Sequence, residues 1–351
     1  MKNEDKKVAV VIANWNGKAL LEDCLNSLKQ QTYKKFEIII IDNGSTDGSV
    51  DYLVRNWPKI KLIVLEKNTG FAYANNLGIQ EAFKNPNIKY VITLNNDTKA
   101  DSFYIEKMVE FADNYPEAGS IQPKVINFFE KDKIDSTGIL IYFDCSAINR
   151  GQKSIDVASN KTEEIFGASA SAALYNRKAL EETKLSEGEF FDNDYFAYYE
   201  DVDLAWRLRL AGFKSFFIPE AKVFHVHSAT GKMYSPFKAF HIHRNQYFNI
   251  IKNLPFGMMW KALFFMPIRY LLLLSSVLMK KGPSSKLNEN TKGKGDGIFL
   301  IVLKSWKEVA VNLPKMIKKR RQIQKTREVN NAEIKNWFKK YSAKMEDMIY
   351  R

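Results

Sequence analysis

Short apolar runs separated by helical patterns dominate the first hundred residues of the chain. Residues 8–13, 36–41, 62–65 and 90–94 are apolar without polar alternation, which is typical of strands buried on both faces. Apolar residues three or four positions apart follow the first three runs, as in helices that cover a sheet. This order predicts an α/β fold with a Rossmann-like, mostly parallel central sheet and helices on both faces.

The pattern changes in the middle of the chain. Strands are expected at 134–143, 213–218 and 223–227. A helix with an apolar stripe is expected to begin near residue 200 and to end before Gly212, since glycine is favoured just past a helix.

Beyond residue 236 the chain is expected to be helical. Residues 254–279 form an apolar run that approaches the length of a membrane span, but Lys261, Pro267 and Arg269 interrupt it. We expect an interfacial helix or helix pair whose basic residues extend toward lipid phosphates. A true span and an ordinary buried helix remain alternatives.

The formal net charge of +13 indicates an anionic partner such as nucleic acid, an anionic membrane or a phosphorylated substrate. Basic clusters at 280–281, 318–321 and 339–340 follow the apolar run without any nucleic-acid motif, which favours a membrane surface over nucleic acid. Two cysteines make no disulfide framework, and the first apolar run is too short for a signal peptide. We therefore expect a cytoplasmic protein, peripheral on the inner face of the cell membrane.

Polar side chains stand where the predicted strands end. Asn14, Asp42, Asn68 and Asp97 each follow a strand, and such positions share one edge of a parallel sheet. The carboxylate of Asp42 can accept a hydrogen bond from an imide N–H such as that of uracil or thymine. Capping of the next helix explains an Asp at this position equally well.

The stretch Asn95-Asn96-Asp97 ends the fourth strand. A turn is the simplest explanation for it. Asp97 also suits Mg²⁺ or Mn²⁺, because these ions take one or two carboxylates together with substrate phosphates.

Carboxylates and histidines cluster in the second half. Glu200, Asp201 and Asp203 surround one helix start, where a cluster can raise one pKa toward that of a general base, although capping accounts for at least one of them. His225 and His227 lie two residues apart on a predicted strand and so face the same side. They are candidate metal ligands, with a structural role as the alternative.

Seven motifs in order resemble family 2 glycosyltransferases of the GT-A fold, most closely the bacterial rhamnosyltransferase-like branch. They span residues 8 to about 228, and the later FHIHRNQYFNIIKN is a weaker match. The seven are VAVVIANWNG, FEIIIIDNGSTDGS, NTGFAYANNLGI, YVITLNNDTKAD, GASASAALYNRKAL, FFDNDYFAYYEDVDLAWRLRLAG and IPEAKVFHVHS.

The resemblance implies roles for the residues at the strand ends. Asp42 would read the pyrimidine ring of a nucleotide-sugar donor. Asp97 and His225 would bind Mg²⁺ or Mn²⁺, and Asn95 stands where the family has the first Asp of its metal motif, which implies a weaker metal site. The other expected nucleotide-sugar-binding residues are Asn14, Asn43, Asn68, Asn96 and Asp97 itself.

The resemblance also implies a catalytic pair. Asp201 is expected to be the general base of an inverting transfer, with Glu200 as the alternative. The run 166–172, in which small residues follow Phe166, allows close approach to the backbone, and the aromatics at 195–199 offer a second wall. Ala168, Ser169 and Tyr199 are therefore expected to line the acceptor site.

These inferences divide the chain into a catalytic domain, 1–235, and a helical, apolar and basic region, 236–351. Within the former, 1–100 would bind the donor and 101–235 the acceptor, a glycan or a polyprenyl-diphosphate-linked sugar. The expected activity is transfer of rhamnose or another hexose from a UDP- or dTDP-sugar during cell-surface polysaccharide synthesis. An inactive scaffold and a sugar nucleotidyltransferase are the alternatives, and the single glycine at Gly17 disfavours the latter.

Overall fold

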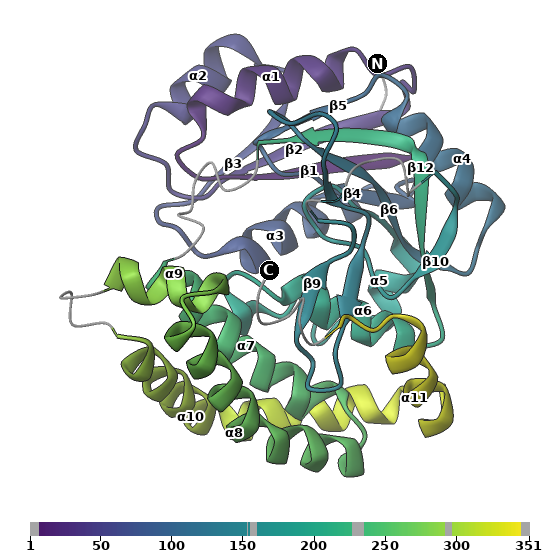
Figure 1. Cartoon of the computed structure of the whole chain (residues 1–351). Coiled ribbons are helices and arrows are strands. Elements are labelled where there is room, and N and C mark those ends of the chain that lie inside the picture. The colour runs from purple at the N-terminus through teal and green to yellow at the C-terminus, as the bar shows by residue number, and fades with distance from the viewer. Residues whose placement is uncertain (1–6, 153, 155–159, 227–234, 292–296, 345–351) are drawn as a thin grey trace.

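The structure is a computed structural model that describes residues 7–152, 154, 160–226, 235–291 and 297–344. A central sheet with the strand order β10-β12-β6-β11-β4-β1-β2-β3 runs through its upper half (Figure 1). Its members are β1 (Val8–Asn14), β2 (Phe36–Asp42), β3 (Lys61–Val64), β4 (Tyr90–Thr93), β6 (Ala118–Asn127), β10 (Glu163–Ile165), β11 (Leu174–Asn176) and β12 (Lys214–His225).

The sheet is mostly parallel, as the sequence predicts. β3, β2, β1 and β4 are parallel neighbours, and β12 is parallel to β6. Among the described strands from β12 to β3, β11 is the one that runs the opposite way, between β4 and β6. Short antiparallel strands β5 (Thr98–Ala100) and β7 (Ile134–Ser136) pair with β12 and β6.

Helices cover both faces because alternate residues of the buried strands point to opposite sides. Val8, Val10 and Ile12 of β1 pack with one set of helices, and Ala9 and Val11 pack with the other. The first set is α1 (Lys18–Lys29), α2 (Ser49–Asn56) and α4 (Tyr104–Asn114), and the second is α3 (Phe71–Phe83), α5 (Arg177–Thr183) and α6 (Glu200–Leu210). This arrangement is the predicted α/β architecture.

Two strand predictions in the second half require correction. The expected strand 134–143 is divided into β7 and β8 (Ile139–Ile141), because Gly138 between them has a φ of +125°, which a strand residue does not adopt. β8 pairs with β9 (Ala147–Asn149) in a separate ribbon. The two strands expected at 213–218 and 223–227 are one strand, β12, with an irregularity between Ile218 and Lys222. His227 lies outside the described residues.

The C-terminal region is helical, as predicted. Its helices are α7 (Pro236–Asn253), α8 (Phe256–Leu278), α9 (Gly282–Thr291), α10 (Ile298–Lys325) and α11 (Asn331–Lys340). They lie on the side of the molecule opposite α1 and α2 (Figure 1). Residues of α7, α8, α10 and α11 share one buried cluster with Trp206 and Leu210 of α6. The packing is therefore continuous across residue 235, where the sequence predicted a domain boundary.

Helix α8 is the one described helix that is long and apolar enough to cross a membrane. Its mean hydropathy is 1.5, and only 22% of that apolar stretch is buried in the protein. The prediction that Arg269 extends toward lipid is wrong. Arg269 is 9% exposed and pairs with the buried Asp144 at 3.2 Å, because it lies on the helix face that packs against the protein.

Candidate active site

The carboxyl ends of β1 and β2 carry a buried polar network. Parallel register places Asn14 next to Asp42, and the Asn14 amide donates to Asp42 Oδ2 at 2.9 Å. The Asn96 amide donates to Asn14 Oδ1 at 2.7 Å. A Cβ added at Gly17 would lie 2.0 Å from the Asn96 amide nitrogen, so a larger residue there would displace this network. Three predicted nucleotide-site residues therefore form one preorganised unit.

Asp42 also has the turn role that the sequence left open. Its Oδ1 accepts a hydrogen bond from the Ser45 N–H at 2.9 Å, and the side chain is fully buried. The reading of a pyrimidine ring by Asp42 stays a prediction.

Asn43 and Asn68 hold the next loop. The Asn43 amide donates to Asn68 Oδ1 at 3.1 Å, and Asn43 Oδ1 accepts from the Thr69 N–H at 2.8 Å. The adjoining Gly70 has a φ of +89°, and the Phe71 N–H donates to the carbonyl of Phe196 at 2.6 Å. The donor-side loop thus touches the segment that leads to α6.

The candidate metal ligands lie beside each other. Asp97 Oδ1 is 3.1 Å from His225 Nε2, and both side chains are nearly buried. His225 Nδ1 lies 2.6 Å from Asp135 Oδ2. A histidine that contacts a carboxylate through one nitrogen presents the other to a cation in a fixed orientation. The donor set fits a divalent cation that substrate phosphates also ligate.

Asp135 was missed by the sequence analysis. The signal was a carboxylate inside the apolar stretch expected at 134–143, but its partner is 90 residues away on β12. Burial by itself lowers the pKa of His225, whereas the bonds to Asp135 and Asp97 raise it to about 10. Within the described residues no group of three or more His, Cys, Asp and Glu side chains is arranged to hold a metal ion. A cation at Asp97 and His225 would therefore need further ligands, such as the phosphates of a substrate.

The predicted catalytic pair begins α6. Tyr199, immediately before it, has a φ of +70°, and Phe196 and Tyr198 also have positive φ values of 61° and 68°. Non-glycine residues reach this region only where surrounding contacts fix them, and such strain clusters at active sites. The segment that leads to Glu200 and Asp201 is therefore held in a defined conformation.

Asp201 lies against the small-residue segment. Its Oδ2 accepts from the Ala170 N–H at 3.3 Å, and Ser169 also bonds its side chain. Burial raises the pKa of Asp201 above its ordinary 3.8 despite these hydrogen bonds. Burial and the neighbouring Asp201 carboxylate raise the pKa of Glu200 well above 4.5. Glu200 Oε2 is buried without a hydrogen-bond partner among the described residues. Both pKa values are shifted upward, which is the direction toward neutral pH that favours general-base catalysis.

The third carboxylate of the cluster, Asp203, forms buried ion pairs. Asp203 is fully buried and pairs with Arg207 at 2.8 Å and Lys252 at 2.7 Å. Burial raises the pKa of Asp203, but Lys252 and Arg207 lower it by more than burial raises it, so the net shift is downward. Asp203 is a structural anion held by two cations.

The three expected acceptor-site residues differ in their surroundings. Ala168 packs in a core cluster, and the hydroxyl of Tyr199 accepts from the Ala147 N–H at 2.9 Å. Ser169 is the one of the three next to Asp201, and its N–H donates to Gln122 Oε1 at 2.7 Å. Their role toward an acceptor remains a prediction.

The small-residue segment joins the two halves of the site. The Asn95 N–H donates to the Ser171 carbonyl at 2.8 Å, and Thr93 Oγ1 donates to the Ala170 carbonyl at 2.7 Å. Ala170 in turn donates its N–H to Asp201. The metal-motif end of β4 and the predicted base thus lie on two sides of one short segment.

Known proteins resemble this chain in sequence and in fold. The chain is 26% identical over 234 residues to N-acetylglucosaminyl-diphospho-decaprenol L-rhamnosyltransferase of Mycobacterium tuberculosis, covering 62% of this chain and 75% of the relative.

Two solved structures share the fold. One is S. aureus TarS 1-349, with a TM-score of 0.51, 14% identity and coverage of 91% of this chain and 90% of that one. The other is mannosyltransferase PcManGT from Pyrobaculum calidifontis in complex with GDP-Man and Mn²⁺, with a TM-score of 0.50, 16% identity and coverage of 87% and 86%. The model of glycosyl transferase family 2 matches residues 9–184, half of the chain, and the protein belongs to that family.

Proposed function

We propose that this glycosyltransferase moves rhamnose or another hexose from a dTDP- or UDP-sugar to a hydroxyl of a polyprenyl-diphosphate-linked glycan, with inversion, in cell-surface polysaccharide synthesis. The observation that carries the proposal is the 169–171 segment, which bonds the metal-motif strand end on one side and Asp201 on the other. The mycobacterial relative, a rhamnosyltransferase for N-acetylglucosaminyl-diphospho-decaprenol, supports the choice of sugar and of lipid carrier.

In this proposal Asp201 accepts the proton of the acceptor hydroxyl. The freed oxygen attacks the anomeric carbon while the nucleoside diphosphate leaves from the opposite face, so a single base is enough. Contacts to the Ala170 N–H and Ser169 orient the Asp201 carboxylate. Glu200, whose buried Oε2 has no hydrogen-bond partner among the described residues, is the alternative base.

The donor would occupy the strand-end network. Asn14, Asp42 and Asn96, together with the Asn43–Asn68 pair, would bind the nucleotide. Asp97 and His225 would hold Mg²⁺ or Mn²⁺, with Asp135 fixing the imidazole. A bound divalent cation neutralises charge on a diphosphate leaving group.

The acceptor lipid requires contact with a membrane, and α8 offers a face for it. Its exposed side chains recur every three or four residues, so they form one apolar stripe. Lys261, Lys280 and Lys281 flank the stripe and are exposed, as expected for a helix that lies among anionic headgroups. The stripe consists of Phe256, Trp260, Phe264, Ile268, Leu271, Leu274 and Leu278.

A panel of nucleotide-sugars tests the donor assignment. The full chain would be mixed with dTDP-rhamnose, UDP-glucose, UDP-N-acetylglucosamine or GDP-mannose, with and without Mn²⁺, and thermal unfolding would be followed. We expect a pyrimidine nucleotide-sugar to raise the melting temperature, more so with Mn²⁺, because a ligand that binds only the folded state stabilises it. Stabilisation by GDP-mannose alone would reject the role of Asp42.

A further inference from the structure

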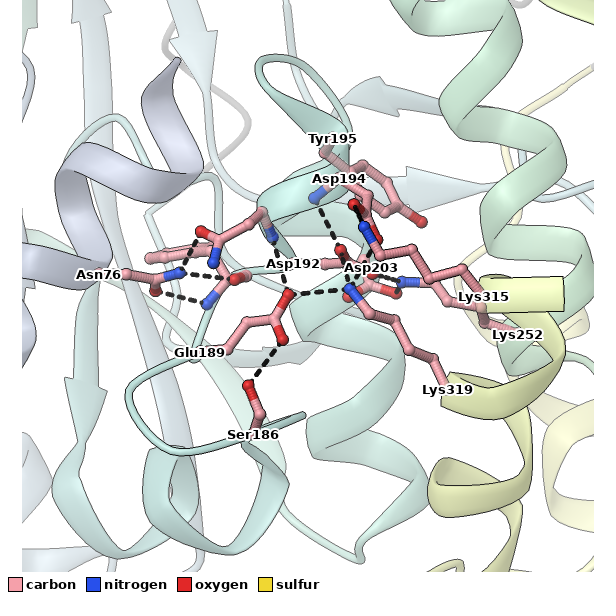
Figure 2. Close-up of polar contacts among 12 residues, drawn as sticks. Asn76, Ser186, Glu189, Asp192, Asp194, Tyr195, Asp203, Lys252, Lys315 and Lys319 are labelled. Carbon is pink, nitrogen blue, oxygen red and sulfur yellow. Dashed lines mark hydrogen bonds and ion pairs between the residues drawn. The ribbon is translucent and has the colours of Figure 1, made fainter. Parts of the chain in front are cut away.

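The segment before α6 faces α10 through a set of ion pairs. Lys319 of α10 reaches three carboxylates of this segment: Glu189 at 2.8 Å, Asp192 at 2.5 Å and Asp194 at 2.8 Å. Lys315, one turn earlier, also pairs with Asp194. Figure 2 shows both lysines extending from α10 toward the acidic segment. Lys319 therefore links three carboxylates of this segment to α10.

A second lysine, Lys252, connects these ion pairs to α6. Lys252 of α7 is fully buried and pairs with Asp192, which Lys319 also contacts, and with Asp203 at 2.7 Å. Asp203 lies on α6, two residues after Asp201. The series Lys319–Asp192–Lys252–Asp203 therefore connects α10 to the helix of the proposed base (Figure 2). We call Lys252, Lys315 and Lys319 the lysine clamp.

Helix α7 also holds the strained backbone in front of the base. The Arg244 guanidinium donates to the carbonyls of Asp194 and Tyr195, both at 2.9 Å. The Asn245 amide donates to the carbonyls of Tyr195 at 3.1 Å, Ala197 at 3.0 Å and Tyr198 at 2.6 Å. Positive φ values persist where such contacts over-determine the backbone. The conformation that presents Glu200 and Asp201 is thus fixed from the C-terminal helices.

We propose that the C-terminal helices position the proposed base through the lysine clamp and that Lys319 is a positioning residue for transfer. The inference rests on the proposed function in one respect: it takes Asp201 as the group that is positioned. Lys319 does not touch the site. It fixes the segment 189–194, whose far end enters the strained residues and then α6.

Lys319 is a better test position than Lys252. Removing Lys252 would leave two fully buried carboxylates without their main cation, which endangers folding. Without Lys319, Asp192 keeps Lys252 and Asp194 keeps Lys315. Lys318, the next residue on α10, is exposed and provides a matched control.

The experiment compares Lys319→Met, Lys319→Arg and Lys318→Met in the full chain. Hydrogen–deuterium exchange of residues 189–199 should rise in Lys319→Met and stay at the wild-type level in Lys318→Met, because local opening follows the loss of contacts. With dTDP-rhamnose and an N-acetylglucosaminyl-diphospho-lipid, kcat of Lys319→Met should fall about ten- to hundredfold, as expected for a misplaced catalytic group. The KM for the donor should stay within about twofold of wild type.

Lys319→Arg should recover most of kcat, because the guanidinium keeps the charge and can reach the same carboxylates. Unchanged exchange of 189–199 in Lys319→Met would overturn the inference whatever the activity shows. Equal loss of kcat in Lys318→Met and Lys319→Met, or a loss confined to KM, would overturn it too. A wild-type chain without transferase activity would contradict the proposed function instead, and the exchange arm would still decide whether the clamp orders the segment.

Discussion

The proposed donor side and the proposed base side of the site are built in different ways. On the donor side, neutral amides and one carboxylate meet at the ends of adjacent parallel strands, in contacts such as Asn14–Asp42 and Asn14–Asn96. On the base side, charged residues from α7 and α10 hold the strained segment before α6. The donor side is fixed by strand register, and the base side depends on contacts with helix residues that lie 47 to 130 positions away in the chain.

The difference has a physical cause. Strand register places the side chains of neighbouring strands opposite each other without a further loss of conformational entropy, because the backbone ladder already orders the strands. A backbone with several positive φ values has no such support and needs contacts from outside. Buried ion pairs supply these contacts, at the risk that losing one partner leaves a charge buried. The donor side should therefore tolerate loss of the C-terminal contacts better than the base side.

The largest expected effect separates the two sides directly. Asp201→Asn should lower the transfer rate by about 10²–10⁴-fold, the contribution of a positioned general base. Nucleotide binding should stay unchanged, since the strand-end network does not involve Asp201. A radiometric transfer assay and a nucleotide titration would be run on the same sample. Full turnover in this variant together with loss in Glu200→Gln would move the base to Glu200.

The same variant has a stability signature. The pKa of Asp201 is raised above 3.8 in the folded chain, so between that value and the raised pKa the folded state binds a proton that the unfolded state releases. The free energy of unfolding contributed by Asp201 thus falls as pH rises through this window and stays reduced at pH 7. Asp201→Asn removes this destabilisation, and its melting temperature at pH 7 should equal or exceed that of the wild type.

A smaller effect is expected from Asp135, which contacts the proposed metal ligand His225. Asp135→Asn should weaken Mn²⁺-dependent donor binding about 10–100-fold, because partners of a ligating histidine tune its basicity and orientation. Asp132→Asn, at an exposed position nearby, is the control. Titration of Mn²⁺ at fixed dTDP-rhamnose measures the difference. Equal Mn²⁺ dependence in the two variants would remove Asp135 from the site.

The smallest effect is expected from the apolar stripe of α8, which lies outside the donor side and the base side. Phe264→Glu should lower binding to phosphatidylglycerol-containing vesicles about tenfold, because the 84% exposed Phe264 would no longer enter the lipid. Phe129→Glu, 74% exposed on the catalytic half, should bind vesicles as the wild type does. Co-sedimentation with vesicles measures both. Identical binding of the two variants would mean that the α8 stripe is not the membrane surface.

Local sequence patterns predicted most of the residues on the proposed donor side. Apolar runs predicted β1, β2 and β4, and Asn14, Asp42, Asn68 and Asp97 were expected to converge at the strand ends. Asn14 contacts Asp42 directly, and Asn96, the residue before Asp97, contacts Asn14. Asp97 and His225 were also expected to meet, and they are 3.1 Å apart. Asp135 was missed because its partner lies on a distant strand. Asp203 was grouped with the candidate bases because spacing along the chain does not reveal that Lys252 neutralises it.

The sequence by itself determined the α/β architecture, the family and the residues at the strand ends, because apolar period and turn chemistry act over a few positions. Only the tertiary structure decided which carboxylates are structural, which histidine contacts two of them, and that the C-terminal helices share a core with α6. These features arise from side chains that are distant in sequence and adjacent in space. Their energies depend on burial and on partner geometry, which no local pattern encodes.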